Sequence, residues 1–157
     1  MKIGRLTASD RACAGTYEDM SGPEIEAALG EIFSPRSLEW ERILVADEQS
    51  TIADALRLLA DEKKCQLIVT TGGTGPAARD VTPEATRSVI EKELPGFGEI
   101  QRMRTFDIAP TSILSRATAG VRGSCLIINL PGRPSAVHEC LAVLSPALLK
   151  ALEILQA

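Results

Sequence analysis

Two short apolar runs constrain the fold of this chain more than any other feature of its sequence. Residues 66–71 (QLIVTT) and 125–130 (CLIINL) are rich in aliphatic side chains and do not alternate between polar and apolar positions. A strand with one face in water would alternate, so each run is typical of a strand covered on both faces. Such strands occur in parallel sheets with helices packed on either side. We therefore predict an α/β fold around a mostly parallel central sheet.

Strand and helix patterns alternate along the rest of the chain. Besides the two buried runs, we predict strands at 2–9, 37–45 and 117–122. Apolar residues at helical spacing predict helices over 21–33, 48–63, 82–93, 134–144 and 146–155. We expect a loop at 10–20, a break at 95–98, and a mixed segment at 99–116 that is helical at first. No repeat or linker is visible, so residues 1–157 are expected to form a single domain.

Composition excludes several classes of protein. The 17 basic and 21 acidic residues give a net charge of −4, and only 3% of residues are aromatic, so a nucleic-acid partner is not expected. No apolar run approaches the ~20 residues that span a bilayer, and charge near the start does not fit a secretory leader. We therefore expect a cytoplasmic protein without a membrane partner. The four cysteines have neither zinc-site nor disulfide-framework spacing, and are interpreted as buried or idle thiols.

A glycine-rich segment follows the first buried run directly. Residues 70–75 read Thr-Thr-Gly-Gly-Thr-Gly, and three glycines in four residues let the backbone approach a ligand closely. Successive N–H groups in such a turn form a concave site for anions such as phosphate. The segment matches neither the P-loop nor the dinucleotide-binding motif. From the residues alone, a phosphate site and a plain glycine-rich turn are about equally well supported.

Two aspartates stand at the ends of neighbouring predicted strands. Asp47 follows the strand at 37–45, and Asp80 lies five residues beyond Gly75. Magnesium that accompanies nucleotide phosphates is usually held by one or two carboxylates together with phosphate oxygens, so the pair is a candidate metal site. The alternative is that each aspartate caps the helix that follows it, and for Asp47 the residues alone favour the cap.

Other strand ends add polar residues to the same predicted edge of the sheet. Ser9-Asp10-Arg11 follows the first strand, and Asn129 to Arg133 ends the second buried run. Ligands in α/β folds bind at the carboxyl ends of strands, so both segments are candidates for the pocket wall. For Ser9-Asp10-Arg11, an Asp-Arg surface turn is the commoner outcome, and for the segment from Asn129 the alternative is a tight strand-to-helix turn. His138, the one histidine, is interpreted as an exposed or half-packed residue and not as a general base, because no serine or cysteine motif accompanies it.

These motifs together resemble one family. The Thr70–Gly75 loop, Arg79-Asp80-Val81-Thr82-Pro83-Glu84, Pro95-Gly96-Phe97-Gly98-Glu99, Leu114-Ser115-Arg116 and Asn129-Leu130-Pro131-Gly132 occur in this order. They are similar to the molybdopterin-binding domain of the MogA/MoaB family. Ser9-Asp10-Arg11 and Asp47-Glu48-Gln49 look more like the MogA branch. The resemblance covers nearly the whole chain and is far more specific than a lone glycine-rich loop.

The resemblance implies a homotrimer of three-layer α/β subunits that adenylylates molybdopterin with ATP and a divalent cation, Mg²⁺ being expected. It implies that Asp47 and Asp80 are the catalytic acidic pair and the metal ligands. The residues implied to bind nucleotide or pterin are Ser9, Asp10, Thr71, Gly72, Gly73, Thr74, Gly75, Ser115, Pro131 and Gly132, of which Ser115, Pro131 and Gly132 match the pterin side. A molybdenum insertase is a possible further partner.

Two departures from the family pattern and two rival functions accompany this resemblance. Arg5 stands where the first strand of the family is usually apolar, and the chain stops at Ala157 where some relatives continue. One rival function is a non-catalytic pterin carrier or scaffold of the same fold. The other is a nucleotide-cleaving relative of the competence-damage type, whose usual extra domain is not seen in this sequence.

Overall fold

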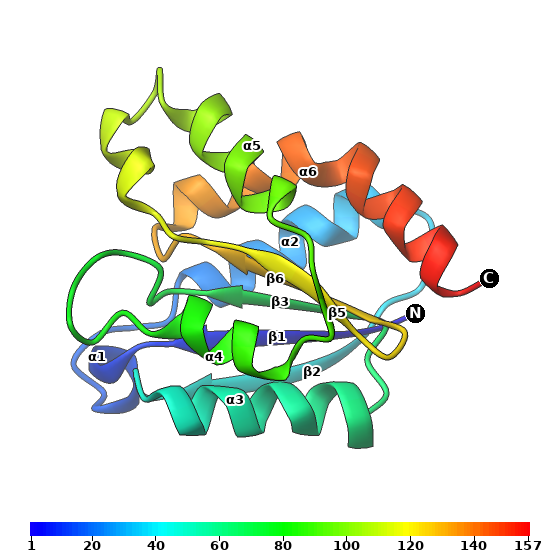
Figure 1. Cartoon of the computed structure of the whole chain (residues 1–157), viewed down its shortest axis with the longest axis horizontal. Coiled ribbons are helices and arrows are strands. Elements are labelled where there is room, and N and C mark those ends of the chain that lie inside the picture. The colour runs from blue at the N-terminus through cyan, green and yellow to red at the C-terminus, as the bar shows by residue number, and fades with distance from the viewer.

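The computed structural model describes residues 1–157 and has a central sheet of six strands with helices on both faces (Figure 1). The strands are β1 (Lys2–Ala8), β2 (Glu39–Val45), β3 (Leu67–Thr71), β4 (Lys92–Glu93), β5 (Ala119–Arg122) and β6 (Cys125–Leu130). Their order across the sheet is β2-β1-β3-β6-β5-β4. Strands β2, β1, β3 and β6 run parallel to one another, β5 pairs antiparallel with β6, and β4 pairs antiparallel with β5. The predicted three-layer α/β fold with a mostly parallel sheet is confirmed.

The helices form two layers around this sheet. The two longest are α2 (Ser21–Phe33) and α6 (Pro134–Leu155), which pack together on one face with α5 (Gly96–Thr105). The other face is covered by α3 (Gln49–Arg57) and α4 (Thr82–Val89). Short helical turns occupy α1 (Asp10–Cys13), η1 (Leu58–Glu62) and η2 (Pro110–Leu114).

The two predicted buried runs separate two apolar cores. Alternate residues of β3 and β6 point to opposite faces, so Leu67 and Val69 contact the layer of α2 and α6, whereas Ile68 contacts the layer of α3 and α4. Ile127 and Ile128 divide in the same way, and all five side chains are fully buried. Burial on both faces explains why neither run alternates in sequence.

The C-terminal segment is one helix, so the prediction of two helices divided before Pro146 was wrong. Proline has no N–H to donate to Ala142, which normally breaks a helix. Here the hydroxyl of Ser145 donates to the carbonyl of Ala142 at 3.1 Å. Leu144 and Leu148, on either side of the proline, are both buried against the sheet. Burial of this continuous apolar face keeps the helix intact.

The apolar character of α6 follows from its place in the core. By length and composition it is the one helix that could cross a membrane. Seven of its residues are buried in the structure, and the largest of these belong to the core cluster between α2 and the sheet. Its hydropathy is therefore explained by packing, and constitutes weak evidence for a membrane span.

Three further boundaries differ from the prediction. The helix expected over 82–93 ends at Val89, because Glu91 and Leu94 donate backbone hydrogen bonds to β5 and the chain there becomes β4. The break expected at 95–98 is instead the start of a helix, because Pro95 caps α5 and Gly96 to Gly98 form its first turn. The loop expected over 10–20 starts with helix α1, whose first turn is capped by the hydroxyl of Ser9, an acceptor for the Ala12 N–H at 3.1 Å.

The charge of Arg5 within β1 is accommodated by ion pairs. Its guanidinium donates to Asp19 at 2.9 Å and to Glu26 at 2.6 Å, both on the segment that leads into or forms α2. Gly22 makes room for it, since a Cβ there would lie 2.0 Å from Arg5 Nη1. An arginine is thus compatible with this strand because α2 supplies the opposite charge.

Candidate active site

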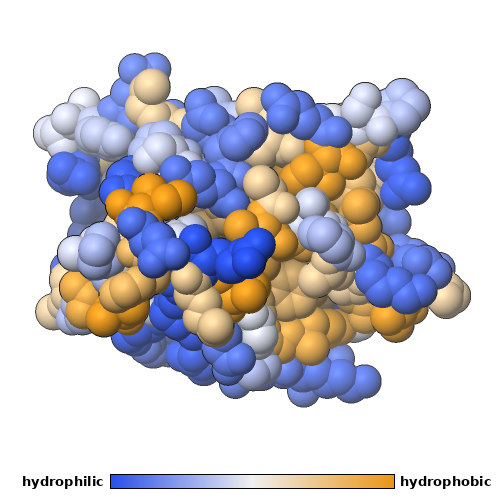
Figure 2. Space-filling view, turned by 90° about the horizontal axis from the view of Figure 1, so that it is seen from above, coloured by the Kyte–Doolittle hydropathy of each residue, from blue (hydrophilic) through white to orange (hydrophobic).

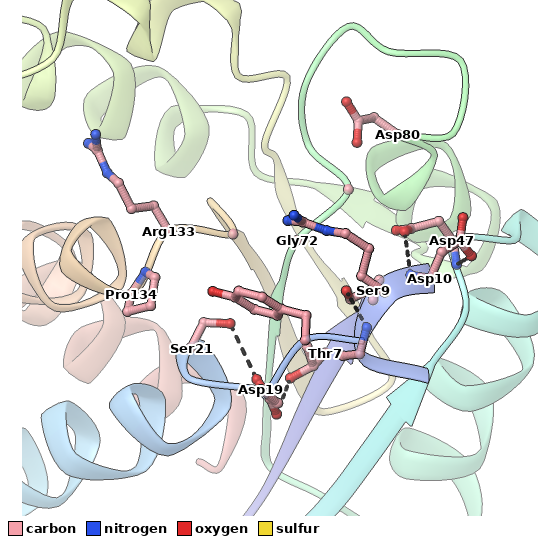
Figure 3. Close-up of a pocket in the computed structure, with 16 residues that line it drawn as sticks. Thr7, Ser9, Asp10, Asp19, Ser21, Asp47, Gly72, Asp80, Arg133 and Pro134 are labelled. Carbon is pink, nitrogen blue, oxygen red and sulfur yellow. Dashed lines mark hydrogen bonds between the residues drawn. The ribbon is translucent and has the colours of Figure 1, made fainter. Parts of the chain in front are cut away.

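The carboxyl ends of β1, β2, β3 and β6 surround a cavity of about 590 Å³ (Figure 3). Parallel strands bring their ends to the same edge of the sheet, so segments far apart in sequence meet there. Seven of the predicted site residues line this cavity: Ser9, Asp10, Asp47, Gly72, Gly73, Asp80 and Gly132. In Figure 3, Asp10 and Asp47 lie side by side, whereas Asp80 is on the separate loop after β3.

A second cavity, of about 260 Å³, lies beside the first. It is formed between the loop after β3, helix α5, the η2 turn and the start of α6. The predicted residues that line it are Thr74, Gly75, Ser115, Pro131 and Gly132. Gly132 and Arg133 line both cavities, so the turn after β6 is the shared wall. The predicted residues therefore divide between two adjoining spaces.

Thr71 is the one predicted site residue that lines neither cavity. Its side chain is fully buried at the end of β3, and its hydroxyl donates to the carbonyl of Pro131 at 2.7 Å. The hydrogen bond joins the end of β3 to the turn after β6. Thr71 thus supports the wall of the smaller cavity from behind.

The glycine-rich loop has the backbone that an anion site requires. Gly72 and Gly73 have φ values of +91° and +65°, which other residues rarely adopt. A Cβ on Gly72 would lie 2.3 Å from the carbonyl oxygen of Ala8, so this turn also needs the close approach that only glycine allows. None of the N–H groups of residues 72–75 donates to a backbone carbonyl. These N–H groups are available to a ligand.

Asp47 does not cap the helix that follows it. Helix α3 begins after Glu48 and has no side-chain cap. One oxygen of Asp47, Oδ2, accepts the N–H of Asp10 at 2.9 Å, whereas Oδ1 is buried and has no hydrogen-bond partner. Burial raises the pKa of this carboxyl, and the negative charges of Asp10 and Asp80 raise it further. A buried carboxylate oxygen without a partner is costly, which favours a bound cation over a structural role.

Asp80 also does not cap its helix. The residue before α4 is Val81, which makes no side-chain cap, and Asp80 Oδ2 instead accepts the N–H of Ala77 at 3.1 Å. A Cβ on Gly75 would lie 2.7 Å from the same oxygen, so the glycine makes room for this carboxylate. The Asp80 carboxylate is thus hydrogen-bonded within the loop after β3, and it lines the same cavity as Asp47.

The donor set fits a cation that completes its coordination with ligand oxygens. No group of three or more His, Cys, Asp or Glu side chains could hold a metal by itself. Asp47 and Asp80 offer two carboxylates on one cavity, and Asp47 Oδ1 has no other partner. Magnesium commonly uses one or two carboxylates, water and substrate phosphates, so this pair is compatible with Mg²⁺ and phosphate arriving together.

Several residues that shape these cavities were not predicted from the sequence. Asp19 lines the larger cavity, where its carboxylate accepts the Thr7 hydroxyl at 3.0 Å (Figure 3). The same carboxylate accepts the Gly22 N–H at 2.9 Å. Its position just before α2 is a recognisable capping signal that could have revealed it. Gln101 and Arg102 line the smaller cavity from α5. Nothing in the spacing of a mixed segment would have revealed them.

Comparisons with known proteins identify the family of this chain. Residues 4–150 match the family model described as a probable molybdopterin binding domain. The molybdopterin adenylyltransferase of Helicobacter pylori J99 is 52% identical over 147 residues, which cover 93% of this chain and 82% of that protein. The Escherichia coli K12 enzyme of the same name is 45% identical over 141 residues, which cover 90% and 72%. The crystal structure of MoaB, a molybdopterin biosynthesis enzyme from Thermus thermophilus, is 41% identical with a TM-score of 0.85, over 98% of this chain and 95% of that one.

The fold and the site define an α/β protein with a glycine-rich loop and two aspartates on one cavity at the carboxyl ends of its parallel strands. With the matches above, this chain belongs to the molybdopterin-binding family of the MogA/MoaB type. The resemblance found in the sequence motifs is confirmed.

Proposed function

We propose that this chain is a single-domain molybdopterin adenylyltransferase, which transfers AMP from ATP to the phosphate of molybdopterin and releases pyrophosphate. The observation that carries the proposal is the pairing of free loop N–H groups with two aspartate carboxylates on one cavity. The names of the relatives that are 45% and 52% identical support the same activity. A nucleotidyltransferase in molybdenum cofactor biosynthesis is therefore the function that the chain supports best.

The two cavities suit the two substrates. The larger one has the acidic pair and Gly72 and Gly73, which fits the triphosphate of ATP. The smaller one has Ser115, Pro131 and Gly132, which the family resemblance assigns to the pterin. Because Gly132 lines both, the phosphate of molybdopterin would meet the α-phosphate of ATP at this shared wall.

The reaction needs little from a general base. A phosphate monoester has a second pKa near 6, so its oxygen is largely ionised at neutral pH. This oxygen forms a bond to the α-phosphorus of ATP, and the bond from that phosphorus to the bridging oxygen breaks as pyrophosphate leaves. No proton has to move for the atoms and charges to balance. The absence of a histidine or lysine from the cavity lining is compatible with this chemistry.

Charge repulsion is the main obstacle that the site has to overcome. Two unit charges ~4 Å apart repel by about 4 kcal/mol at an effective dielectric constant near 20. A divalent cation held by Asp47 and Asp80 would supply neutralising charge between the two phosphates. The N–H groups of residues 72–75 bind phosphate oxygens and orient the reacting groups in line. These residues thus act by binding, orientation and electrostatics.

A direct assay tests the proposal. Purified chain, ATP, magnesium and molybdopterin should yield adenylylated pterin and pyrophosphate in equal amounts, measured by mass spectrometry and a coupled pyrophosphate assay. Pterin binding without either product would indicate the carrier instead. Consumption of ATP without adenylylated pterin would indicate a nucleotide-cleaving enzyme.

Variants of the acidic pair test its assigned role. Asp80→Asn should leave pterin binding nearly intact and lower turnover on the order of 100-fold, because Asp80 is assigned to the cation and not to the pterin. Asp47→Asn should behave alike. Asp54→Asn is a matched control, because Asp54 lies on α3 outside both cavities and is exposed. Unchanged turnover in Asp80→Asn, or a loss of stability without loss of rate in Asp47→Asn, would discard the assignment.

We also propose a cytoplasmic homotrimer. Exposed apolar side chains are concentrated at the end of α5 and in the segment after it, including Met103 at 72%, Ile108 at 66% and Ile113 at 62%. Figure 2 shows the face over α5 and α6, where apolar side chains lie between polar ones. Light scattering should give three times the chain mass, and Met103→Glu should lower it if this surface is in the contact. Hand-off of the product to a molybdenum insertase is testable by a pull-down with that enzyme.

A further inference from the structure

Asp10 and Asp47 are joined by two reciprocal hydrogen bonds. The N–H of Asp10 donates to Asp47 Oδ2 at 2.9 Å, and the N–H of Asp47 donates to Asp10 Oδ1 at 2.9 Å. The pair closes a ring between the end of β1 and the end of β2 (Figure 3). Because Oδ2 of Asp47 is held by this ring, its other oxygen, Oδ1, is fixed in one orientation, the one without a partner.

The same carboxylate of Asp10 also holds the loop after β3. Arg79, 69 residues further along the chain, donates from Nε to Asp10 Oδ2 and from Nη2 to Asp10 Oδ1, each at 2.9 Å. This two-pronged geometry fixes direction as well as distance. Arg79 directly precedes Asp80. One carboxylate is thus bonded to Asp47 and to the neighbour of Asp80.

These bonds leave Asp10 little capacity to bind anything else. Its Oδ1 already accepts two hydrogen bonds, from Asp47 and Arg79, and Oδ2 accepts a third. The hydrogen bonds from Arg79 and from the Asp47 backbone hold the pKa of Asp10 below its ordinary value, so it stays ionised near neutral pH. The charge of Arg79 is likewise committed to Asp10.

The ion pair contributes little to global stability. The side chains of Arg79 and Asp10 are 59% and 41% exposed, and ion pairs in water typically stabilise a fold only slightly. Its removal should therefore loosen the site without unfolding the chain. This makes a positioning role separable from a general structural one.

We propose that Asp10 and Arg79 are positioning residues: they form a clasp that fixes Asp47 and Asp80 relative to each other, and neither holds substrate nor cation. The inference rests on the proposed function and assigns Asp10 a different role from the binding one that the family resemblance implies. Asp47 and Asp80 come from different junctions of the sheet, and the Asp10 carboxylate is the group that connects both.

The test compares Arg79→Met, Arg79→Lys and Asp10→Asn with the wild type. Arg79→Met should lower kcat on the order of 10- to 100-fold, because small displacements of a reacting group have effects of this size. The KM values for ATP and molybdopterin should change less than about threefold, because neither Arg79 nor Asp10 is proposed to contact either substrate. Arg79→Lys should have a kcat between those of Arg79→Met and the wild type, because lysine keeps the positive charge but cannot donate two parallel hydrogen bonds to the Asp10 carboxylate.

Two further readouts separate a clasp from other roles. The Arg79→Met and Asp10→Asn double variant should be no slower than the slower single variant, because both changes break one contact. Hydrogen exchange of the Asp47 N–H should be faster in Arg79→Met than in the wild type. Arg122→Met is the matched control: it removes a similar two-pronged pair with Asp61 at the opposite end of the sheet, and should leave kcat unchanged.

Each result decides between named alternatives. A rise in either KM with kcat unchanged would show that Arg79 contacts substrate and would overturn the clasp. Unchanged kcat and unchanged hydrogen exchange would overturn it as well. If the wild type itself makes no product, the proposed function fails, and hydrogen exchange at Asp47 still decides whether the clasp exists.

Discussion

The guanidinium of Arg116 holds the backbone of Asp80: its Nη2 donates to the Asp80 carbonyl oxygen at 2.7 Å. Its Nε donates to the carbonyl of Gly75 at 2.9 Å, and its own backbone N–H donates to the carbonyl of Thr74 at 2.8 Å. The same side chain is ion-paired with Glu84 on α4. Arg116 therefore ties both ends of the loop that carries Asp80 to each other and to the following helix.

Replacement of Arg116 by methionine should lower both turnover and stability. The loop loses hydrogen bonds from a charged donor to two of its carbonyls, so the free energy of unfolding should fall by about 1–3 kcal/mol in urea denaturation. Turnover should fall at least tenfold, on the order expected when a reacting group is displaced, because the Asp80 carbonyl loses its hydrogen bond from Arg116. Glu84→Gln is the control, since Arg116 keeps its bonds to both loop carbonyls. Equal damage in the two variants would show that the ion pair, and not the loop contacts, is what matters.

Glycine at position 73 should be required for activity. Its φ of +65° is strained for alanine, and a Cβ would lie 2.5 Å from Thr82 Oγ1 and 3.1 Å from Asp47 Oδ1. Gly73→Ala should destabilise the chain by about 1–3 kcal/mol and displace Asp47, so that turnover is largely lost. Gly30→Ala is the matched control: apart from its chain neighbours and the backbone of its own helix, nothing lies within 4 Å of its Cβ position in α2, so it should stabilise the chain by about 0.5–1 kcal/mol. Normal turnover in Gly73→Ala would show that the loop does not need this backbone.

The parts of the fold that were predictable from sequence are those set by local pattern. Buried runs of aliphatic residues identified β3 and β6, and the glycine-rich segment after β3 identified a loop in which Gly72 and Gly73 have positive φ values. Strand ends in a parallel sheet must converge, which is why Asp47 and Asp80 could be paired from sequence and do line one cavity. The assignment of Thr71 to the cavity lining was less accurate. Side chains of a strand alternate in direction, so a shift of one residue separates a side chain that faces the cavity from one that packs behind its wall.

The parts that were not predictable depend on contacts that local pattern does not encode. Ser145 is bonded to its own helix, and no periodicity shows that this hydroxyl replaces the N–H that Pro146 lacks. The Asp10–Arg79 pair spans 69 residues, and the Arg116–Asp80 bond spans 36. A charged residue in a loop has many possible partners, and only the folded topology selects one.

Asn129 should be a major source of stability at the centre of the sheet. Its side chain is fully buried in β6, where its amide donates to Thr70 at 3.0 Å and to Thr86 at 2.8 Å and accepts the N–H of Thr118 at 3.3 Å. Asn129→Leu leaves the buried Thr118 N–H without an acceptor and should lower the free energy of unfolding by about 2–4 kcal/mol. Ile127→Val, a loss of one methylene group in the same strand, should lower it by only about 0.5–1.5 kcal/mol. A smaller effect in Asn129→Leu than in Ile127→Val would contradict the importance of the polar network.

Glu26 links α2 to the two neighbouring strands β1 and β2 by charge. Its Oε1 accepts Arg5 Nε at 2.6 Å from β1 and Arg42 Nε at 2.6 Å from β2, and its Oε2 accepts Arg42 Nη2 at 2.8 Å. Hydrogen bonds from Arg42 and, less strongly, from Arg5 hold the pKa of Glu26 below its ordinary value of 4.5, although partial burial opposes this. The carboxylate is only 22% exposed, so its interactions are less screened than those of a surface pair.

The stability that Glu26 contributes should depend on pH in a defined direction. A carboxyl whose pKa is lower in the folded chain than in the unfolded chain stabilises the fold to its full extent only where it is ionised in both states. This contribution is complete above the unfolded value of 4.5 and is lost as the pH falls through the folded value. Glu26→Gln should therefore be less stable than the wild type by about 1 kcal/mol at pH 7, and the difference should shrink steadily below pH 4.5.

Urea denaturation of both proteins between pH 3 and 7 measures the difference, and Glu31→Gln on the same helix, whose carboxylate has no ion-pair partner, is the control. A difference that stays constant over this range would mean that Glu26 acts through packing and not through its charge.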